Sequence, residues 1–319
     1  MDRIFVGHIG LILSSVNPML SIHPENQLIL QAPTQRYTVF VLAFVFYLIA
    51  AVYCIYISRQ PGSIAAIWYA NAIMVMFLQK VAYRDWPVMF VLAVLGNLTA
   101  NMLFKDAFGL SLAFIPGNML EIGLAAYCLR RFIPLRQSMQ DPVLLLKMLG
   151  LMLLPAMISA SAGALALSLY GLVSYEQGWL FLFTGSVVGL ISIIPMGILL
   201  VSYGWQDFIQ INQSFTFLMC ILLALLIALF GFVYLPDPYI YISATLMLVA
   251  FIGRFPGTAV AVLVYSLIIS TLIALGFFQS SLQGQYINGE SYLYLPLIMT
   301  LLQPLLLGAA MQRLKQVKA

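Results

Sequence analysis

The chain has 319 residues, of which 63% are hydrophobic and only 8% charged, and its mean hydropathy is +1.03. A soluble domain of this length could not bury so much apolar surface in one core, so the composition predicts a polytopic membrane protein with the lipid bilayer as its partner. The net charge of +4 is small, and nothing outside the apolar stretches is basic and aromatic enough to predict nucleic-acid binding.

Residues 1–36 form a lead-in to the first clear apolar stretch. Residues 4–20 are apolar but interrupted by polar residues and Pro18, and they lack the charged start and small-residue cleavage site of a signal peptide. A helix lying in the membrane interface is one interpretation. The sequence does not show whether this segment enters the membrane.

From Tyr37 onward, apolar stretches of about 20 residues alternate with short polar breaks. We expect an all-α fold, a transmembrane bundle of about ten spans over residues 37–311 followed by a basic tail at 312–319. The predicted spans are 37–57, 63–79, 86–104, 109–129, 142–170, 179–203, 214–235, 238–253, 256–278 and 291–311. Only Gly253-Arg254-Phe255-Pro256-Gly257 separates the eighth from the ninth, and we interpret it as a hairpin tip because Arg is costly at mid-membrane.

The distribution of Lys and Arg predicts the orientation of these spans. With ten spans, Arg59 and Lys105 fall on one side and twelve basic residues fall on the other. The positive-inside rule therefore places both termini, including the basic tail, in the cytoplasm.

Glu121 is the most unusual residue in the predicted membrane region. It is the carboxylate farthest from the ends of any span, and an ionisable group at membrane depth costs roughly 2.5–3.5 kcal/mol on the insertion scale. Such a group usually faces the bundle interior or a water-filled cavity. Asn118 lies three residues earlier on the same helix face.

The two preceding spans also carry polar residues, namely Trp68 and Asn71 in one and Asn97 and Asn101 in the other. Buried amides need hydrogen-bond partners, so we expect one cluster shared by the second, third and fourth spans. This cluster either binds an unknown small ligand or only fixes helix packing, since membrane amides often pair across helices for about 0.6–2 kcal/mol without a further role.

Catalytic and metal-binding patterns are absent from the sequence. There is no Gly-rich phosphate loop, HExxH or GxSxG, and the only histidines, His8 and His23, precede the first clear span. The three cysteines form no CxxC and are expected to be packing residues. We therefore expect no enzyme activity, no metal and no cofactor.

An ordered set of motifs resembles the bacterial membrane-associated sensor domain of the first type, over about residues 37–315. The set comprises Ala66-Ile67-Trp68-Tyr69-Ala70-Asn71-Ala72, Trp86-Pro87, Gly96-Asn97, Asn118-x-x-Glu121, Leu129-Arg130-Arg131, Gly189 with Pro195, Leu235-Pro236 and Arg254-Phe255-Pro256. The resemblance implies a multi-pass sensory module of the bacterial inner membrane. In that family the module precedes a cytoplasmic output domain, often a diguanylate cyclase that makes cyclic-di-GMP, and receptor membership would imply a homodimer.

Two features depart from the family pattern. Where the family often has an acidic residue in the sixth span, this chain has Ser186, which puts the binding properties of this copy in question. No output domain follows the basic tail, so the chain is either a piece of a longer receptor or a free-standing module that acts through a partner protein. From the residues alone, a small-molecule transporter or channel and an assembly partner in a membrane complex both remain as alternatives.

Overall fold

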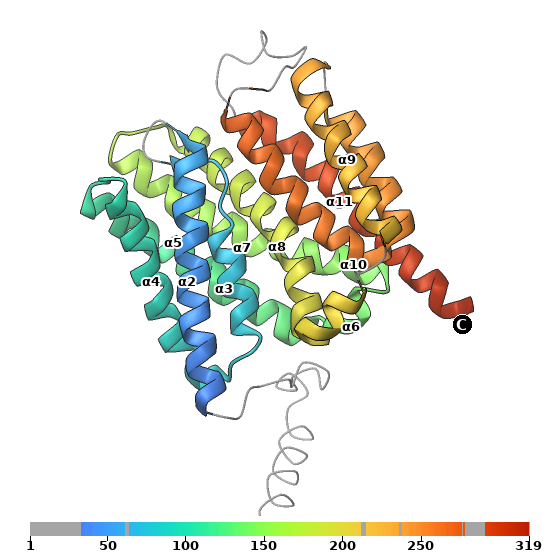
Figure 1. Ribbon diagram of the computed structural model, residues 1–319. Helices are drawn as coiled ribbons and strands as arrows, with labels where there is room; N and C mark the ends of the chain where they lie inside the picture. Colours follow the sequence, from blue (N-terminus) through green and yellow to red (C-terminus); the bar gives the residue numbers. More distant parts are fainter. Residues whose placement is uncertain are drawn as a thin grey trace, which may run out of the picture.

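The computed structural model describes residues 33–60, 64–211, 215–235, 238–275, 277 and 291–318. The lead-in up to residue 32 lies outside these ranges. The helices are α2 (Pro33–Ser58), α3 (Ala70–Leu78), η3 (Tyr83–Asp85), α4 (Trp86–Leu103), α5 (Phe108–Phe132), α6 (Leu135–Ser138), α7 (Pro142–Leu169), α8 (Tyr175–Ile211), α9 (Phe215–Tyr234), α10 (Tyr239–Ala274) and α11 (Ser291–Lys318). Figure 1 shows α2 to α5 on one side of α8 and α9 to α11 on the other.

The helical membrane bundle predicted from the apolar stretches is confirmed. Within the described ranges, seven helices are long and apolar enough to cross a membrane, at 35–58, 83–103, 108–132, 142–169, 175–202, 239–273 and 294–317. The count of about ten is therefore not confirmed. The two counts differ at four predicted spans. The spans at 63–79 and 214–235 do not qualify in full, and the spans at 238–253 and 256–278 form one helix.

The predicted helix at 63–79 is wrong for its first half. Arg59–Gln60 (β1) and Ile64–Ala65 (β2) form a two-residue antiparallel ladder within the otherwise all-helical fold. Residues 66–69 are neither helix nor strand, and only the nine residues of α3 are helical. Contacts with distant helices decide this geometry, as described below.

Helix α10 folds back on itself at Arg254. This residue has φ 53° and ψ −158°, which no helix allows. Tyr265 lies beside Thr245, whereas 20 residues of straight helix would separate them by about 30 Å. The predicted hairpin tip is thus confirmed, although by length and composition α10 is a single candidate span. Helix α9 coincides with the predicted span at 214–235, but only Ile221–Gly231 qualifies there, as a shorter apolar helix.

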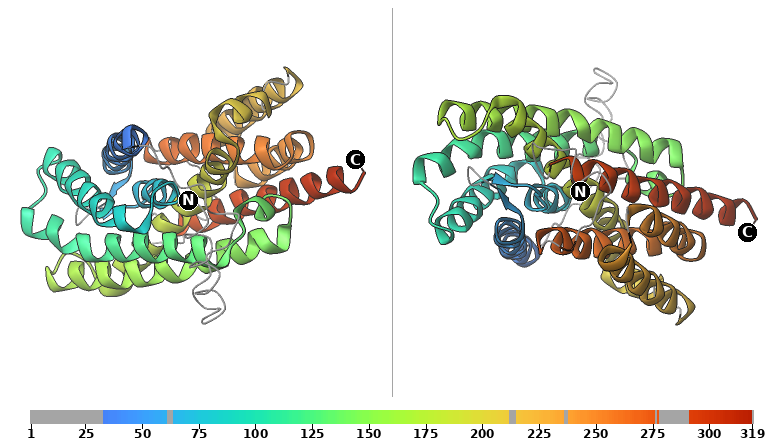
Figure 2. Two further views of the ribbon diagram at one scale, coloured as in Figure 1. Left: turned by 90° about the horizontal axis from the view of Figure 1, so that it is seen from below. Right: turned by 90° about the horizontal axis from the view of Figure 1, so that it is seen from above.

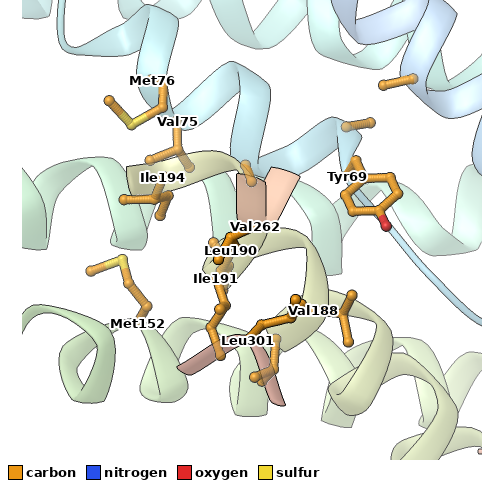
Figure 3. Close-up of a cluster of buried hydrophobic side chains, with 14 of the residues drawn as sticks. Tyr69, Val75, Met76, Met152, Val188, Leu190, Ile191, Ile194, Val262 and Leu301 are labelled. Carbon is orange, nitrogen blue, oxygen red and sulfur yellow. The ribbon is translucent and has the colours of Figure 1, made fainter. Parts of the chain in front are cut away.

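Helix α8 forms the centre of the bundle. In its most apolar 18-residue stretch 83% of the residues are buried, a larger share than in any other candidate span of the described residues. Figure 3 shows its residues Val188, Leu190, Ile191 and Ile194 between side chains of other elements. The surrounding side chains are Val75 and Met76 from α3, Met152 from α7, Val262 from α10 and Leu301 from α11. Burial of one helix among several others places polar groups of α8 out of reach of lipid.

Ion pairs mark the two ends of the bundle. At one end Arg36 pairs with Asp85, and Arg313 pairs with Asp141 at 3.5 Å. At the other end Arg59 pairs with Asp106. We call these the Arg36 end and the Arg59 end. The last turns of α11, from residue 313 to residue 317, are exposed. The C-terminal part of α11 projects from the bundle (Figure 2), at the end where α2 begins (Figure 1). The cytoplasmic location of that end stays a prediction of the positive-inside rule.

Candidate functional site

A non-helical segment, residues 66–69, runs through the bundle beside α8. All its backbone N–H groups donate to neighbouring elements: Ala66 to Ser58 O at 2.9 Å, Ile67 to Ser58 Oγ at 3.2 Å, Trp68 to Gly185 O at 3.3 Å and Tyr69 to Cys54 Sγ at 3.3 Å. Irregular backbone at membrane depth is tolerated only where protein satisfies it in this way. Helices α2 and α8 therefore hold the segment in place.

Two glycines of α8 make room for this segment. A Cβ atom on Gly185 would lie 2.6 Å from the carbonyl oxygen of Ala66, and one on Gly189 would lie 2.9 Å from the carbonyl carbon of Trp68 and closer still to its oxygen. Both clashes involve backbone atoms, which cannot rotate away. Any side chain at either position would displace residues 66–69.

Asn71, in the first turn of α3, is the hub of a buried polar network. Its Oδ1 accepts from Trp68 Nε1 at 2.9 Å and from the Tyr47 hydroxyl at 3.4 Å. Its Nδ2 donates to Asn118 Oδ1 at 3.0 Å and to Glu121 Oε2 at 2.8 Å. One amide thus joins α2, the non-helical segment and α5.

Glu121 is 1% exposed and lies 13 residues into α5, about 20 Å along the helix axis. Its Oε2 also accepts from the hydroxyl of Ser186 at 3.0 Å, and Ser159 lies beside the same carboxyl group. Its other oxygen, Oε1, has no hydrogen-bond partner among the residues that the structure describes. No ion pair found in those residues involves Glu121.

A cavity of about 50 Å³ lies next to this network. Its wall is formed by residues of α2, β2, α4, α5, α7 and α8, and of the non-helical segment, namely Ile55, Ala65, Trp68, Asn97, Asn101, Phe114, Asn118, Ser159, Leu182 and Ser186. The amide of Asn101 donates to the carbonyl oxygen of Asn97 at 2.8 Å and to its Oδ1 at 3.1 Å. Since Ile55, Ala65 and Asn101 lie near the Arg59 end of their elements, the cavity extends from the Glu121 network toward that end.

A second network, made of hydroxyl groups, begins one residue after Trp68. The Tyr69 hydroxyl lies 2.7 Å from Ser266 Oγ and 3.0 Å from Ser270 Oγ, both on the returning arm of α10. Ser192 of α8 donates to Ser266 Oγ at 2.7 Å. These groups link the non-helical segment to the arm of α10 that follows Arg254.

The far end of α3 is held by cationic side chains. Arg130 of α5 is 1% exposed and donates to the carbonyl oxygens of Leu78 and Val81, the latter at 2.9 Å. Its guanidinium lies over the rings of Tyr83 and Trp86, 4.7 and 5.4 Å from their centroids. Lys80 Nζ donates to the Val201 carbonyl oxygen at 2.9 Å, and burial lowers the pKa of this lysine. Helix α3 is therefore fixed to both α5 and α8.

Comparison with known families decides the identity of this bundle. The model of MASE1, a membrane sensor domain found in diguanylate cyclases, matches residues 37–315. The chain belongs to the MASE1 family. It also aligns with the probable diguanylate cyclase DgcE of Escherichia coli (strain K12), at 23% identity over 192 residues. That alignment covers 60% of this chain but only 17% of DgcE. No solved structure matches the chain.

This MASE1 domain brings together the six residues of the polar cluster expected from the sequence. Trp68, Asn71, Asn118 and Glu121 share one hydrogen-bond network, and Asn97 and Asn101 line the cavity beside it. Whether they bind a ligand is not settled by their proximity and stays a prediction.

Three residues of the site were missed by sequence reasoning. Tyr47 looks like one of many aromatic residues in α2, and Ser159 belongs to a run of small residues that indicates helix packing. Ser186 drew attention only because the family often has an acidic residue at its position. Nothing in the sequence indicates its hydrogen bond to Glu121, because 65 residues separate the two.

Proposed function

We propose that this MASE1 domain is the input module of a signalling receptor, and that it binds a small ligand in the cavity beside Glu121. The observation that carries the proposal is a cavity whose partly polar wall comes from several helices and from a glycine-dependent non-helical segment. A ligand that favours one packing of these elements over another would shift the equilibrium between them.

The output in this proposal is cyclic-di-GMP, made by a cytoplasmic domain in cis or by a partner protein. The support is the MASE1 match together with the similarity to a probable diguanylate cyclase, of which this chain spans a small part. The bundle itself would carry no catalytic activity. Dimerisation through a second copy of the chain belongs to the same proposal.

The proposed topology has ten crossings and both termini in the cytoplasm. Three observations support it: the chain passes from the Arg59 end to the Arg36 end through residues 66–78, α9 is helical over 20 residues, and α10 turns back at Arg254. The basic residues of α2, α5 and α11 that form contacts at the Arg36 end, together with Lys80 just after α3, agree with the positive-inside rule. Reporter fusions at residues 105 and 254 should report opposite sides of the membrane.

The test of the function uses a fusion of residues 1–319 to a diguanylate cyclase catalytic domain. We expect Glu121→Gln to change cellular cyclic-di-GMP about fivefold or more, within the range of typical coupling energies. The matched control is Glu176→Gln, which removes the same charge from an exposed position in the first turn of α8. Equal cyclic-di-GMP in both variants, at equal expression, would contradict a sensory role for the carboxylate.

A transporter remains the second candidate, because non-helical backbone inside a membrane helix bundle is typical of substrate sites in transporters. Purified protein in liposomes would separate the two functions. Solute accumulation that Glu121→Gln abolishes supports transport, whereas a tight membrane combined with a ligand-dependent cyclase fusion supports sensing.

A further inference from the structure

The charge balance of the cavity narrows the class of ligand. Glu121 is the acidic residue of the network, and the basic side chains of the surrounding helices contact other groups: Arg36 binds Asp85, Arg59 binds Asp106, Lys80 binds a carbonyl oxygen and Arg130 binds two carbonyl oxygens. An anion would therefore meet a buried carboxyl group without a compensating cation. A cation would neutralise it.

The other polar groups of the wall are oxygen-rich. Asn97, Asn101 and Asn118 contribute amide groups to the wall, and Ser159 and Ser186 contribute hydroxyl groups. Glu121 does not line the cavity itself but lies directly behind the wall, where it accepts from Ser186, and its Oε1 has no hydrogen-bond partner in the described residues. Oxygen ligands of this kind suit hard cations. The aromatic rings of Trp68 and Phe114 line the same space and can attract a cation by their π-electrons.

The size and the charge of the site both favour a small monovalent ion. A water molecule needs a cavity volume of at least about 10–15 Å³. A cavity of about 50 Å³ therefore accommodates one small cation with a few of its water molecules. Ca²⁺ takes about six to eight oxygen ligands and Mg²⁺ demands near-ideal octahedral geometry with several bound waters, whereas this network supplies one carboxyl group beside a small cavity. A single positive charge would match the one carboxylate that Glu121 offers when it is ionised.

We propose that the cavity binds one small monovalent cation, an alkali ion or a small ammonium ion, with Glu121 as its counter-ion. The binding site follows from the residues around Glu121 alone. Only the consequence of binding, a change in signalling output, rests on the proposed function. Because the cavity extends toward the Arg59 end, the cation enters from that side of the membrane.

The test measures equilibrium binding of radioactive sodium to the full chain in lipid nanodiscs. N-methyl-D-glucamine chloride keeps the ionic strength constant, and potassium and methylammonium are added as competitors. We expect saturable binding of about one sodium ion per chain. If the site prefers an ammonium ion, labelled methylammonium should bind with the same stoichiometry. Glu121→Gln should weaken this binding at least tenfold, while Glu176→Gln should leave it unchanged.

Two results would overturn the proposal. One is the lack of saturable binding of both sodium and methylammonium to a folded chain, with the fold checked by circular dichroism. The other is binding that Glu121→Gln does not weaken. Ser186→Ala provides a milder variant, because it removes one hydroxyl donor to Glu121 without changing the charge, and it should alter affinity or ion preference by less than Glu121→Gln does.

The binding test and the test of the proposed function can give opposite results, and each combination has its own meaning. If the fusion responds to cavity substitutions but the nanodisc protein binds no cation, the ligand class is wrong and the sensory role stands. If the cation binds with one ion per chain but the fusion ignores both the cation and Glu121→Gln, the binding site stands and the sensory role fails.

Discussion

Replacing Gly189 by alanine is the sharpest test of the arrangement around the non-helical segment. The added Cβ would lie 2.9 Å from the Trp68 carbonyl carbon, closer to its oxygen, and 3.3 Å from Tyr69 Cα. Overpacking in a well-packed interior typically costs about 1–3 kcal/mol. Because the clash involves backbone atoms, we expect a cost near 3 kcal/mol.

The hydrogen bonds of the segment lead to a similar magnitude. Residues 66–69 can move away from α8 only by stretching the bonds from Trp68 N to Gly185 O and from Tyr69 N to Cys54 Sγ. Each such bond contributes about 0.5–1.5 kcal/mol net, so losing both costs about 1–3 kcal/mol. The displaced Trp68 would also release Asn71, which should weaken cation binding along with stability.

The assay is reversible unfolding in mixed micelles titrated with sodium dodecyl sulfate, followed by circular dichroism. The control is Gly150→Ala in α7, where a Cβ would meet no atom within 4 Å. Alanine should leave that variant unchanged or stabilise it by up to about 1 kcal/mol through helix propensity. If Gly189→Ala unfolds within about 0.5 kcal/mol of the unmodified chain, a typical limit for a neutral substitution, the close approach of α8 to Trp68 is refuted.

Three further substitutions test other parts of the site. Asn71→Ala removes the hub of the network and should lower the free energy of unfolding by about 2–4 kcal/mol. The same micelle titration measures this change, and a change below about 0.5 kcal/mol would contradict the role of Asn71 as hub. Arg130→Met keeps an apolar stem but frees two carbonyl oxygens and two aromatic rings, so we expect a loss of about 2 kcal/mol. The matched control is Arg131→Met, because half-buried Arg131 lies over the exposed ring of Phe132, and it should cost less than Arg130→Met. Tyr69→Phe should change stability by less than about 1.5 kcal/mol yet reduce the ligand response of the cyclase fusion about fivefold or more; an unchanged response would exclude the hydroxyl network from coupling.

Much of the fold was predictable because apolar length alone encodes a membrane helix. The predicted spans at 86–104, 109–129 and 142–170 match α4, α5 and α7 to within three residues at each end. The turn at Arg254 was predictable for a related reason, since a charged residue beside Gly and Pro is costly inside a span. In both cases the local sequence carries the physical cause.

The non-helical segment could not be predicted, because its cause lies elsewhere in the chain. Residues 66–69 are apolar and compatible with a helix, and what unwinds them is the shape of α8 at Gly185 and Gly189 together with acceptors on α2. The residues of the polar cluster could be predicted from the sequence, but the residue at its centre could not. Glu121 was the most costly residue in the sequence, whereas the structure makes Asn71 the residue with the most partners.

The position of the hydroxyl network suggests how the site communicates with α11. Trp68 lines the cavity, and the next residue, Tyr69, contacts Ser266 on the returning arm of α10. The tip of α10 in turn packs on α11 at Gly308, where a Cβ would lie 2.6 Å from Thr258 Oγ1 and 3.1 Å from the Arg254 carbonyl oxygen.

Such close packing makes α10 and α11 move together, because neither surface can slide past the other without a clash. Helix α11 then continues beyond the bundle as the exposed residues 313–317. In the proposed function, a ligand that displaces residues 66–69 would act on α11 through two contacts, the Tyr69 hydroxyl and the α10 tip. Coupling of this kind requires two discrete packings of α10, and the response of Tyr69→Phe in the cyclase fusion measures whether the first contact selects between them.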